Sequence, residues 1–563
     1  MALSALHRKL IEDGTKLWDD RRALESFWDE SALAFWPEMA NFQQSLPTGD
    51  YAAHLSSSYP VIARRTLGDS LSALLRPASL DTTSPGVWFS VRTDRQHRED
   101  HESKRWLEWA TGIQRRAMYD RNTGFVRATK ESDHAFVTFG QCVIAVTLNR
   151  AGERLLYRAR HLKDVVWREN AEGEINHVQY RWRPTAVELH HTFGDRVAQQ
   201  VKNKLRTDPY EIVECRHIVI AAEDYASRDE GGQKHMTPWV SIWVDTVNET
   251  VLEETGSWSR VYVIPRWQTL PGGQYAASPA VIAALPDARL IQAIALALQE
   301  SSEKFGDPPM VATDQALRGD SDLRAGGITW VDRDYDEKTG AAIRPLYQPE
   351  WGRGLQGVFA LNTDIRDMID KAFYLDTLTM PPADVNRMTA FEVSQRINEW
   401  LRRAVPLFEP MEFDYNGQIC EATFELLMRG GAFGRFSDIP PAIRNADVSF
   451  TFQSPLHENA DRRKGQKFLE ASALLAQAAQ LDGSVVPLLD ARTALRDALE
   501  GIGVPINWTR DNETMDDLAR TAAQTKAMEQ VMMGAAGVAE TADKLGSAAK
   551  NFASANAQQP AVV

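Results

Sequence analysis

Two helical patterns flank a turn-rich segment near the middle of the chain, and this arrangement constrains the fold more than any other feature. The first helix is predicted directly after Pro286, with Asp287 in its first turn, where the helix dipole favours an anion. Residues 307–352 are rich in Gly, Asp and Pro, which predicts short strands and turns. The second helix carries apolar residues at helical spacing: Ile365, Met368, Ile369, Ala372 and Phe373. The chain is therefore expected to run outward along one helix, to form a small segment of strands and turns, which we call the excursion, and to run back along the second helix.

The chain before this pair of helices predicts a helical start followed by a β-rich module. One stripe of an amphipathic helix is marked by Leu10, Leu17, Leu24 and Trp28. A strand near 87–91 and a second helical stretch over about 103–129 follow. Between 135 and 267 the pattern is β, in runs such as 143–148, 211–220, 239–245 and 261–265. A helical start joined to a β-rich module predicts an α+β fold.

The strongest local signal follows the second helix. The chain breaks at Met380-Pro381-Pro382, and Thr389 and Glu392 then form a capping box, in which each side chain accepts a hydrogen bond from the other residue's backbone N–H. We expect a helix to begin there and to be kinked by Pro406 and Pro410, because proline lacks a backbone donor. One more helix is marked by Cys420, Phe424, Leu427 and Met428 and is closed by Gly430 and Gly431.

Composition limits the classes of protein that the chain can belong to. Its 563 residues allow three or four domains, and 43% hydrophobic with 25% charged residues is typical of a folded protein. The net charge of −14 excludes binding of nucleic acid over the whole surface, so any contact with DNA must be local or non-adhesive. Three distant cysteines indicate synthesis in a reducing cytosol without a disulfide framework. The charged N-terminus is unlike a signal peptide, and no run reaches the roughly eighteen apolar residues that a membrane-spanning helix needs.

The sequence offers no catalytic constellation. It lacks a phosphate loop, an H-E-x-x-H motif, a C-x-x-C pair and a G-x-S-x-G elbow. Residues 332–336 resemble the opening of a calcium loop, but Glu337 stands where the turn needs glycine. The His190-His191 pair and the Cys215-Arg216-His217 run lack partners at metal-ligand spacing. We therefore predict no enzyme activity, no metal and no cofactor, and we expect the sixteen tryptophans to pack in cores or interfaces.

A set of short motifs occurs in a fixed order along residues 1–460. The longest runs from Met380-Pro381-Pro382 through Met388-Thr389-Ala390-Phe391-Glu392-Val393-Ser394-Gln395-Arg396. The others, in order, are Trp18, Arg21 and Trp36-Pro37; Asp69 to Leu75 with Trp88-Phe89; Tyr275 with Ser278-Pro279-Ala280; Leu285-Pro286-Asp287; and Ser454-Pro455-Leu456. Together they resemble the portal, or head-to-tail connector, proteins of short-tailed bacteriophages. Phe391 departs from the family signature, which usually has a small or polar residue there.

The resemblance implies an α+β portal fold with an α/β wing, a two-helix stem, a small α/β clip, a tunnel loop with a kinked helix, and a helical C-terminal crown. The implied boundaries are wing 1–285, stem helix 286–306, clip 307–352, stem helix 353–380, tunnel loop 381–388, kinked wing helices 389–435, crown region 436–514, and an Ala-rich, partly disordered tail 515–563.

The resemblance also implies a functional site in the tunnel loop, at the DNA channel: Pro381, Pro382, Asp384, Asn386 and Arg387. Asn386 and Arg387 could touch phosphates transiently, while the two prolines would stiffen the base of the loop. The alternative is an interhelical turn with no further role. Thr389 and Glu392 are interpreted as a structural helix cap, worth about 1 kcal/mol, with no part in chemistry.

The implied function is that of a ring, usually of twelve copies, at one capsid vertex. The ring would be the channel for viral DNA packaging and ejection and the attachment point for terminase and tail. Its partners would be other copies of the chain, the major capsid and scaffolding proteins, terminase, tail adaptor proteins and the double-stranded DNA in the channel, with no membrane. It would be made in the host cytoplasm and located in the virion. Two alternatives stay open: an oligomeric scaffold or adaptor without a DNA channel, and a hydrolase with an unrecognised acidic site.

Overall fold

The structure is a computed structural model, and the chain in it forms two compact units. It describes residues 2–43, 51–77, 88–94, 100–228, 236–269, 271–306, 310–312, 343–345, 351–378, 411–452, 465, 467–478, 489–501, 504, 508–511 and 514–525. Unit 1 comprises Met1–Asp94, Trp109–Asp438 and Ala446–Asn459, and unit 2 comprises Arg95–Glu108, Ile439–Asn445 and Ala460–Val563.

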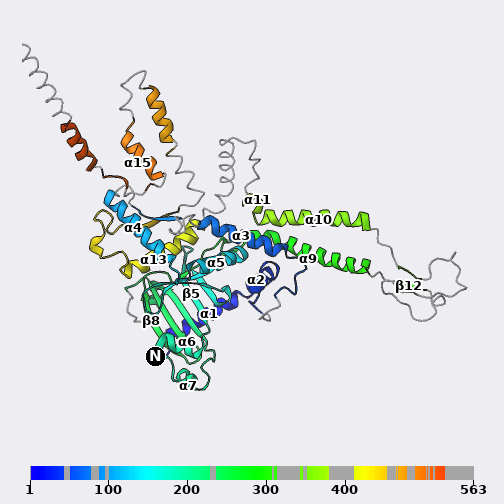
Figure 1. The fold of residues 1–563 in the computed structure, drawn as a ribbon. Coiled ribbons are helices and arrows are strands. Elements are labelled where there is room, and N and C mark those ends of the chain that lie inside the picture. Colours follow the sequence, from blue (N-terminus) through cyan, green and yellow to red (C-terminus); the bar gives the residue numbers. More distant parts are fainter. Residues whose placement is uncertain are drawn as a thin grey trace, which may run out of the picture. The chain divides into compact units, whose positions relative to one another are not determined.

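The centre of unit 1 is an antiparallel sheet of five strands in the order β4–β5–β6–β7–β8 (Figure 1). The strands are β4 (Val165–Glu169), β5 (Ile175–Trp182), β6 (Cys215–Ala221), β7 (Trp239–Asp245) and β8 (Thr250–Ser257). Ile218 and Ile220 of β6 join a buried cluster with Leu10 of helix α1 (Ala5–Asp20), whereas Val219 belongs to a different cluster. Successive side chains of a strand point to opposite faces, so the sheet buries both.

The second face of this sheet packs against a smaller sheet, β3–β2–β9, and against helix α2. These elements are β2 (Val143–Leu148), β3 (Leu155–Arg160), β9 (Tyr262–Val263) and α2 (Arg22–Phe35). Trp28 of α2 and Trp167 of β4 are 1% and 0% exposed in this cluster. Burying an aromatic side chain of this size contributes roughly 1.5–3 kcal/mol, so this layer is a main source of the stability of unit 1.

Further helices and a two-stranded sheet complete unit 1. They are α3 (Tyr59–Leu75), α5 (Phe125–Phe139), α13 (Gln418–Arg429) and the antiparallel pair of β1 (Phe89–Thr93) and β14 (Val448–Phe452). Helix α5 ends at Gly140, which has φ of 75°. A Cβ on Gly140 would lie 2.2 Å from the backbone of Ala277, so both the conformation and the space at this position require glycine.

The prediction of an all-β segment from 135 to 267 is wrong in part, because helices lie between the strands. They are α6 (Ala186–Phe193), α7 (Gln199–Thr207) and α8 (Ala222–Arg228). Helix α6 begins at a capping box, in which the Glu188 backbone N–H donates to the Thr185 hydroxyl (3.3 Å) and the Thr185 N–H donates to the Glu188 carboxylate (3.1 Å). The single helix predicted over 103–129 is two helices, α4 (His101–Met118) and α5, which extends to Phe139.

Helices α9 (Pro279–Gly306) and α10 (Trp351–Ala372) lie side by side as a hairpin (Figure 1). Strands β12 (Met310–Ala312) and β13 (Ile343–Pro345) pair antiparallel between them, which confirms strands in the predicted excursion. The expectation that the first helix begins after Pro286 is wrong, since Pro286 lies inside α9. The helix begins earlier because the Ser278 hydroxyl accepts from the Val281 N–H (3.3 Å) and proline occupies the first helical position.

The described C-terminal part of unit 2 is helical. It contains α15 (Ala491–Gly501) and helical residues at 467–478 and 514–525. Several apolar side chains of this part are exposed: Leu469, Leu474, Leu495, Trp508, Met515 and Leu518. The disorder predicted for the end of the tail concerns residues after 525, which lie outside the described part of the chain.

The remaining short elements connect these larger ones. They are the 3-10 turns η1 (Pro37–Met39), η3 (Leu162–Asp164), η4 (Gly194–Arg196) and η7 (Phe436–Asp438), the strand pair β10 (Gln268–Thr269) and β11 (Ala276–Ala277), helix α11 (Leu375–Leu378) and the π-helix η6 (Glu412–Gly417). Helices and antiparallel sheets that alternate in this way confirm the predicted α+β class.

Candidate functional site: the helical hairpin and its base

The structure does not describe the predicted loop itself. The loop and cap residues that lie outside the described residues are Pro381, Pro382, Asp384, Asn386, Arg387, Thr389 and Glu392. The described chain stops at Leu378, the last residue of α11, and resumes at Met411, directly before η6. The surroundings of the site are therefore defined by the hairpin and by these two ends.

The base of the hairpin is fastened to the start of α3 through polar side chains. The Gln292 carbonyl of α9 accepts from the backbone N–H groups of Ser56 and Ser57, both at 2.7 Å, and its amide donates to the Ser57 carbonyl at 2.8 Å. The Tyr59 hydroxyl donates to the carboxylate of Asp370 on α10 at 2.6 Å. Both helices of the hairpin are thus attached to the same turn of chain.

One side of the hairpin packs closely against the rest of unit 1. Its buried residues include Ile291 of α9, Ile365 and Ile369 of α10, and Phe373 directly after α10. The ring of Phe373 meets Phe35 of α2 edge-on, with centroids 5.3 Å apart. Met368, which the sequence places in the same apolar stripe, is instead 47% exposed. The helical spacing of the apolar residues therefore predicted α10 correctly, but it did not predict which of those residues are buried.

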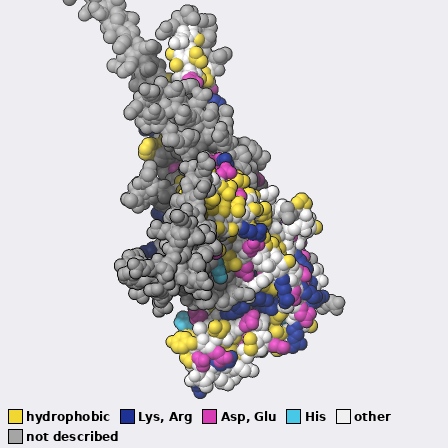
Figure 2. Space-filling view, turned by 90° about the vertical axis from the view of Figure 1, so that its right-hand side faces the viewer, with side chains coloured by type: hydrophobic (Ala, Val, Ile, Leu, Met, Phe, Trp, Pro, Cys, Tyr) yellow, Lys and Arg dark blue, Asp and Glu magenta, His cyan; other side chains and the backbone are white. Residues whose placement is uncertain are grey.

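The hairpin also leaves apolar side chains uncovered. These residues, which we call the outer apolar face, are Ile282, Leu290, Leu296, Phe359, Leu361 and Met368, and they are 43–58% exposed. They lie on more than one side of the hairpin, because Phe359 and Leu361 are two residues apart on α10 and therefore point in nearly opposite directions. Figure 2 views the side toward which α9 and α10 extend in Figure 1, and hydrophobic side chains are visible at several places on that side. An exposed apolar area of this kind indicates an interaction surface.

Helix α9 is also long and apolar enough, by length and composition alone, to cross a membrane. Within Pro279–Glu303 an 18-residue window has a mean hydropathy of 1.7 and is 28% buried. The sequence contains no uninterrupted run of about eighteen apolar residues, as predicted. Helix α9 nevertheless reaches the hydropathy threshold through many Ala, Leu and Ile residues with few charges among them.

Two carboxylates approach each other on the hairpin. Burial raises the pKa of Asp287 on α9 above its usual range, and the nearby charge of Asp364 on α10 raises it further. The neighbouring Arg289 pairs with Glu30 of α2. The hairpin thus carries two interacting acidic groups, one on each helix.

Four aromatic rings connect the two ends of the undescribed segment. Ring centroids are 6.4 Å apart for Tyr374 and Trp267, 5.5 Å for Trp267 and Phe136, and 5.6 Å for Phe136 and Tyr415. Tyr374 has φ of 56°, a left-handed conformation that is uncommon for a bulky side chain. Its carbonyl accepts from Leu378 (2.9 Å), so this residue turns the chain from α10 into α11.

A buried ion pair holds the π-helix η6 in place. Arg76 and Asp133 form this pair, with side chains that are 4% and 0% exposed. Arg76 also donates to the Asn416 side-chain carbonyl (2.7 Å), and the Asn416 amide donates to the Leu75 carbonyl (3.0 Å). Burial, with the nearby Asp133 charge, raises the pKa of Tyr415 well above its usual value. A π-helix is rare and often marks a functional position, and here helices α3 and α5 stabilise it.

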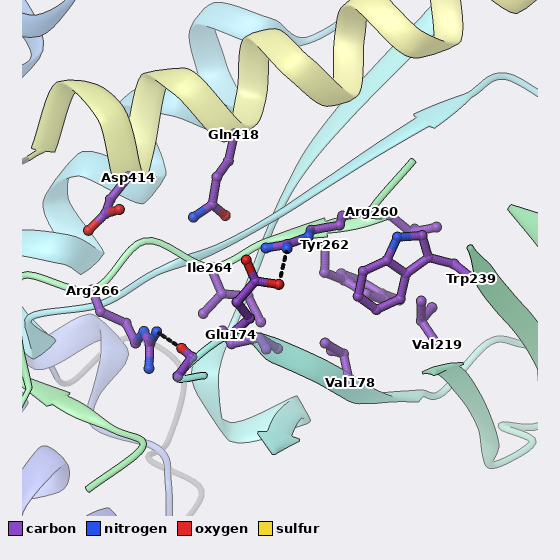
Figure 3. A pocket seen from close by; sticks show the side chains of 13 residues that line it. Glu174, Val178, Val219, Trp239, Arg260, Tyr262, Ile264, Arg266, Asp414 and Gln418 are labelled. Atoms are coloured by element: carbon purple, nitrogen blue, oxygen red, sulfur yellow. Dashed lines mark hydrogen bonds and ion pairs between the residues drawn. The ribbon is translucent and has the colours of Figure 1, made fainter. Parts of the chain in front are cut away.

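A cleft of about 180 Å³ lies between the five-stranded sheet, η6 and α13 (Figure 3). Val178, Val219, Trp239, Tyr262 and Ile264 supply its apolar lining. Two ion pairs, Arg260 with Glu174 (3.1 Å) and Arg266 with Glu169, lie at its edge. Burial raises the pKa of Asp414, and Arg266 opposes that shift. The lining contains no His, Cys, Ser or Lys.

Metal-binding and thiol chemistry find no support in the described part of the chain. Within the described ranges no three His, Cys, Asp or Glu residues are grouped to hold a metal ion. His217 bonds to the Tyr262 and Ser241 hydroxyls instead of a ligand partner. Burial raises the pKa values of Cys142, Cys215 and Cys420, which keeps these thiols protonated.

The structure thus combines an α+β body with a helical hairpin that carries exposed apolar residues. The sequence matches the family of bacteriophage head to tail connecting proteins over residues 7–508, and the chain belongs to this family. The protein is thus a phage portal, or head-tail connector, protein, and its family is a structural one.

Curated relatives with portal names come from two phages. A probable portal protein of Bordetella phage BPP-1 is 26% identical over 290 residues, which is 51% of this chain and 50% of the relative. The portal protein of Salmonella phage epsilon15 is 22% identical over 541 residues, which is 94% of this chain and 93% of the relative. A chain from the virion of a native gene transfer agent particle aligns with a TM-score of 0.31 and 8% identity, covering 76% of this chain and 87% of its own.

Proposed function

We propose that twelve copies of the chain form a closed ring at one capsid vertex, with an axial channel through which viral DNA is packaged and ejected. The outer apolar face of the hairpin carries this proposal. Its members lie on both helices and are 43–58% exposed in the single chain. A ring in which the hairpin of each copy packs against the next would bury them at every interface.

The proposed regions follow the order of elements along the chain. Helices α9 and α10 serve as the stem, and the pair β12–β13 belongs to the clip. The five-stranded sheet and its covering helices form the wing, and the helices of unit 2 contribute to the crown. Residues 381–388 form the tunnel loop, from which Asn386 and Arg387 reach the DNA, and Thr389 with Glu392 caps the next helix.

The charge of the chain supports a conduit in preference to a DNA-binding surface. Each copy carries a net charge of −14, and the hairpin adds the neighbouring pair Asp287 and Asp364. A negatively charged lumen repels phosphates, so the duplex would pass without sticking. Brief contacts from a few loop side chains would then position the DNA without retaining it.

The same proposal places the ring between several partners. The major capsid and scaffolding proteins would surround the wing, whereas terminase and later the tail adaptors would bind the clip. The chain would be synthesised in the host cytoplasm and carried into the virion. The portal names of the phage relatives support this placement.

Electron microscopy of the purified full-length protein tests the proposal. We expect closed rings of about twelve copies whose lumen is wider than the roughly 20 Å DNA duplex. Rings with a closed centre would favour the alternative of an adaptor without a DNA channel. A chain that stays monomeric at every concentration and salt level would contradict the ring.

A packaging assay tests the loop. Arg387→Ala should leave the rings intact and reduce the amount of DNA packaged, because the loop would lose a phosphate contact. Arg127→Ala is the matched control, since this side chain is 84% exposed and pairs only with Glu131 of its own helix among the described residues. Normal packaging by the Arg387→Ala rings would remove this residue from the site.

A further inference from the structure

Arg64 of α3 is a buried arginine that has no anionic partner among the described residues. The residue is 4% exposed, and its Nε and Nη1 atoms are buried and donate no hydrogen bond. Its guanidinium lies over the ring of Trp36, with Cζ 4.7 Å from the ring centroid. Across the part of the chain that the structure describes, no carboxylate lies within ion-pair distance of it.

The acidic groups around Arg64 are used elsewhere or face solvent. Asp69 lies on the same helix, but it is 3.1 Å from the ammonium group of Lys130 and 3.6 Å from His134. Glu38 is exposed, and its negative charge raises the pKa of Arg64. Burial lowers the pKa of Arg64 to about 10, against the opposing effect of Glu38, so the side chain still carries its charge at neutral pH.

An unpaired guanidinium in this position is unfavourable for the single chain. Removing a charge from water is costly unless an anion and hydrogen bonds replace the water. The contact with Trp36 offsets part of this cost, but a ring face offers no acceptor for Nε or Nη1. The described part of the chain therefore supplies no carboxylate to pair with this positive group.

We propose that a carboxylate of a neighbouring copy of this chain pairs with Arg64 in the ring. This inference rests on the proposed ring and identifies one of its contacts. The position is continuous with the hairpin, because Tyr59 in the first turn of α3 bonds to Asp370 of α10.

A protein carboxylate fits the site better than a DNA phosphate does. The guanidinium is too deeply buried to meet the backbone of a rigid duplex, whereas the carboxylate of one Asp or Glu side chain is a much smaller anion. The planar guanidinium donates to a carboxylate through paired N–H groups, which would satisfy the unpartnered nitrogens. The net charge of −14 means that neighbouring copies supply carboxylates in excess.

Arg64→Met gives a test in which stability and assembly change in opposite directions. In the unassembled chain the substitution removes an uncompensated buried charge, so the melting temperature should stay equal or rise. In the ring it leaves the neighbour's carboxylate unpaired, so the concentration needed for half-assembly should rise by about tenfold or more. Mass photometry over a dilution series measures assembly, and thermal unfolding below the assembly concentration measures stability.

Arg65→Met is the matched control. Arg65 is the next residue of α3, its side chain is 75% exposed, and it lies 4.0 Å from Asp69. We expect the control to shift half-assembly by less than about threefold, since exposed ion pairs contribute little. The proposal is overturned if Arg64→Met assembles like the wild type, or if it lowers the melting temperature of the unassembled chain. A wild-type chain that forms no ring would instead refute the proposed function on which this inference rests.

Carbodiimide cross-linking identifies the partner directly. The Arg64→Lys chain presents an amine at this position, which the reagent joins to an adjacent carboxylate. Rings assembled from equal amounts of 14N- and 15N-labelled chain should yield a cross-linked peptide that pairs one isotope at position 64 with the other isotope at an Asp or Glu. Cross-links confined to Glu38 or Asp69 of the same chain would overturn the proposal.

Discussion

The five-stranded sheet and the helical hairpin bury their apolar residues in different ways. The sheet is covered on one face by α1 and on the other by a second sheet and α2, so that Trp167 and Ile242 are both 0% exposed. The hairpin buries Ile369 against the rest of unit 1 but leaves Phe359 58% exposed on its outer apolar face. A single chain therefore covers both faces of the sheet but leaves part of the hairpin exposed, and other copies would cover that part in the proposed ring.

This difference separates the determinants of folding from those of assembly. Substitutions in the sheet should change the stability of one chain, because the partners of each side chain are intramolecular. Substitutions on the outer apolar face should change the association of chains and little else. The predictions below test this separation, in order of their expected effect on the stability of the unassembled chain.

Trp167→Ala should cause the largest loss, about 3–5 kcal/mol of the free energy of unfolding. The indole fills the centre of the larger core cluster and donates to the Gln274 carbonyl (3.2 Å), so its removal leaves both a cavity and an unpaired acceptor. Urea unfolding of the unassembled chain measures the loss. Phe359→Ala is the comparison on the hairpin and should change this free energy by less than about 0.5 kcal/mol. Equal losses at the two positions would remove the distinction between the regions.

Mild acid should cause the second-largest loss of the free energy of unfolding, because the sheet contains two buried histidines. Burial lowers the pKa values of His177 and His217 to about 3, below the roughly 6.5 of an unfolded chain. Below pH 6.5 the unfolded chain binds more protons than the folded one, so stability falls as the pH falls toward the folded values. From pH 7 to 5.5 each histidine should cost about 1 kcal/mol. Unfolding midpoints across this range measure the loss, and His217→Gln should reduce the slope. A flat profile would show that neither histidine is held neutral.

Tyr59→Phe should have a smaller and local effect. The change removes the hydrogen bond from the hydroxyl to the Asp370 carboxylate, for a cost of about 1 kcal/mol. Because this bond fastens α10 to α3, deuterium uptake should accelerate in the first turn of α3 and the end of α10. Tyr210→Phe is the control, since Tyr210 is 77% exposed. Unchanged uptake around Asp370 would show that the base of the hairpin is held without this bond.

The combined substitution Leu290→Ser and Leu296→Ser should have the smallest effect on the single chain, less than about 0.5 kcal/mol, because both side chains are already exposed. The same change should reduce ring formation strongly, since it places hydroxyls in the proposed interface. Mass photometry measures the ring population. Ile212→Ser, at a residue 63% exposed outside the hairpin, serves as the control. Normal assembly of the double variant would exclude this face from the interface.

Local patterns in the sequence predicted several elements well. Strand β7 occupies the predicted residues 239–245, and α13 ends at the predicted Gly430, followed by Gly431 with φ of 72°. These signals depend on a few neighbouring residues, so no tertiary information is needed. Helix α6 was missed although Thr185 and Glu188 form a capping box, because the surrounding β pattern was extended across it.

The environment of the site could not be predicted in the same way. Arg76 contacts Asp133, which is 57 residues away in the sequence, and Asn416, which is 340 residues away. Nothing in the sequence near Arg64 indicates that this residue is buried. The exposure of Met368 was equally hidden, since helical spacing does not say whether an apolar face meets its own chain or another. The roles of Asn386 and Arg387, which lie outside the described residues, stay predictions.

Hydroxyl-radical footprinting of the hairpin tests the central claim most directly. Met368 and Phe359 are 47% and 58% exposed in the single chain, and Met236, outside the hairpin, is 93% exposed. Assembly should protect Met368 and Phe359 several-fold from oxidation while Met236 stays as reactive as before. Equal oxidation of Met368 and Phe359 in assembled and unassembled protein would contradict the claim that other copies cover the outer apolar face.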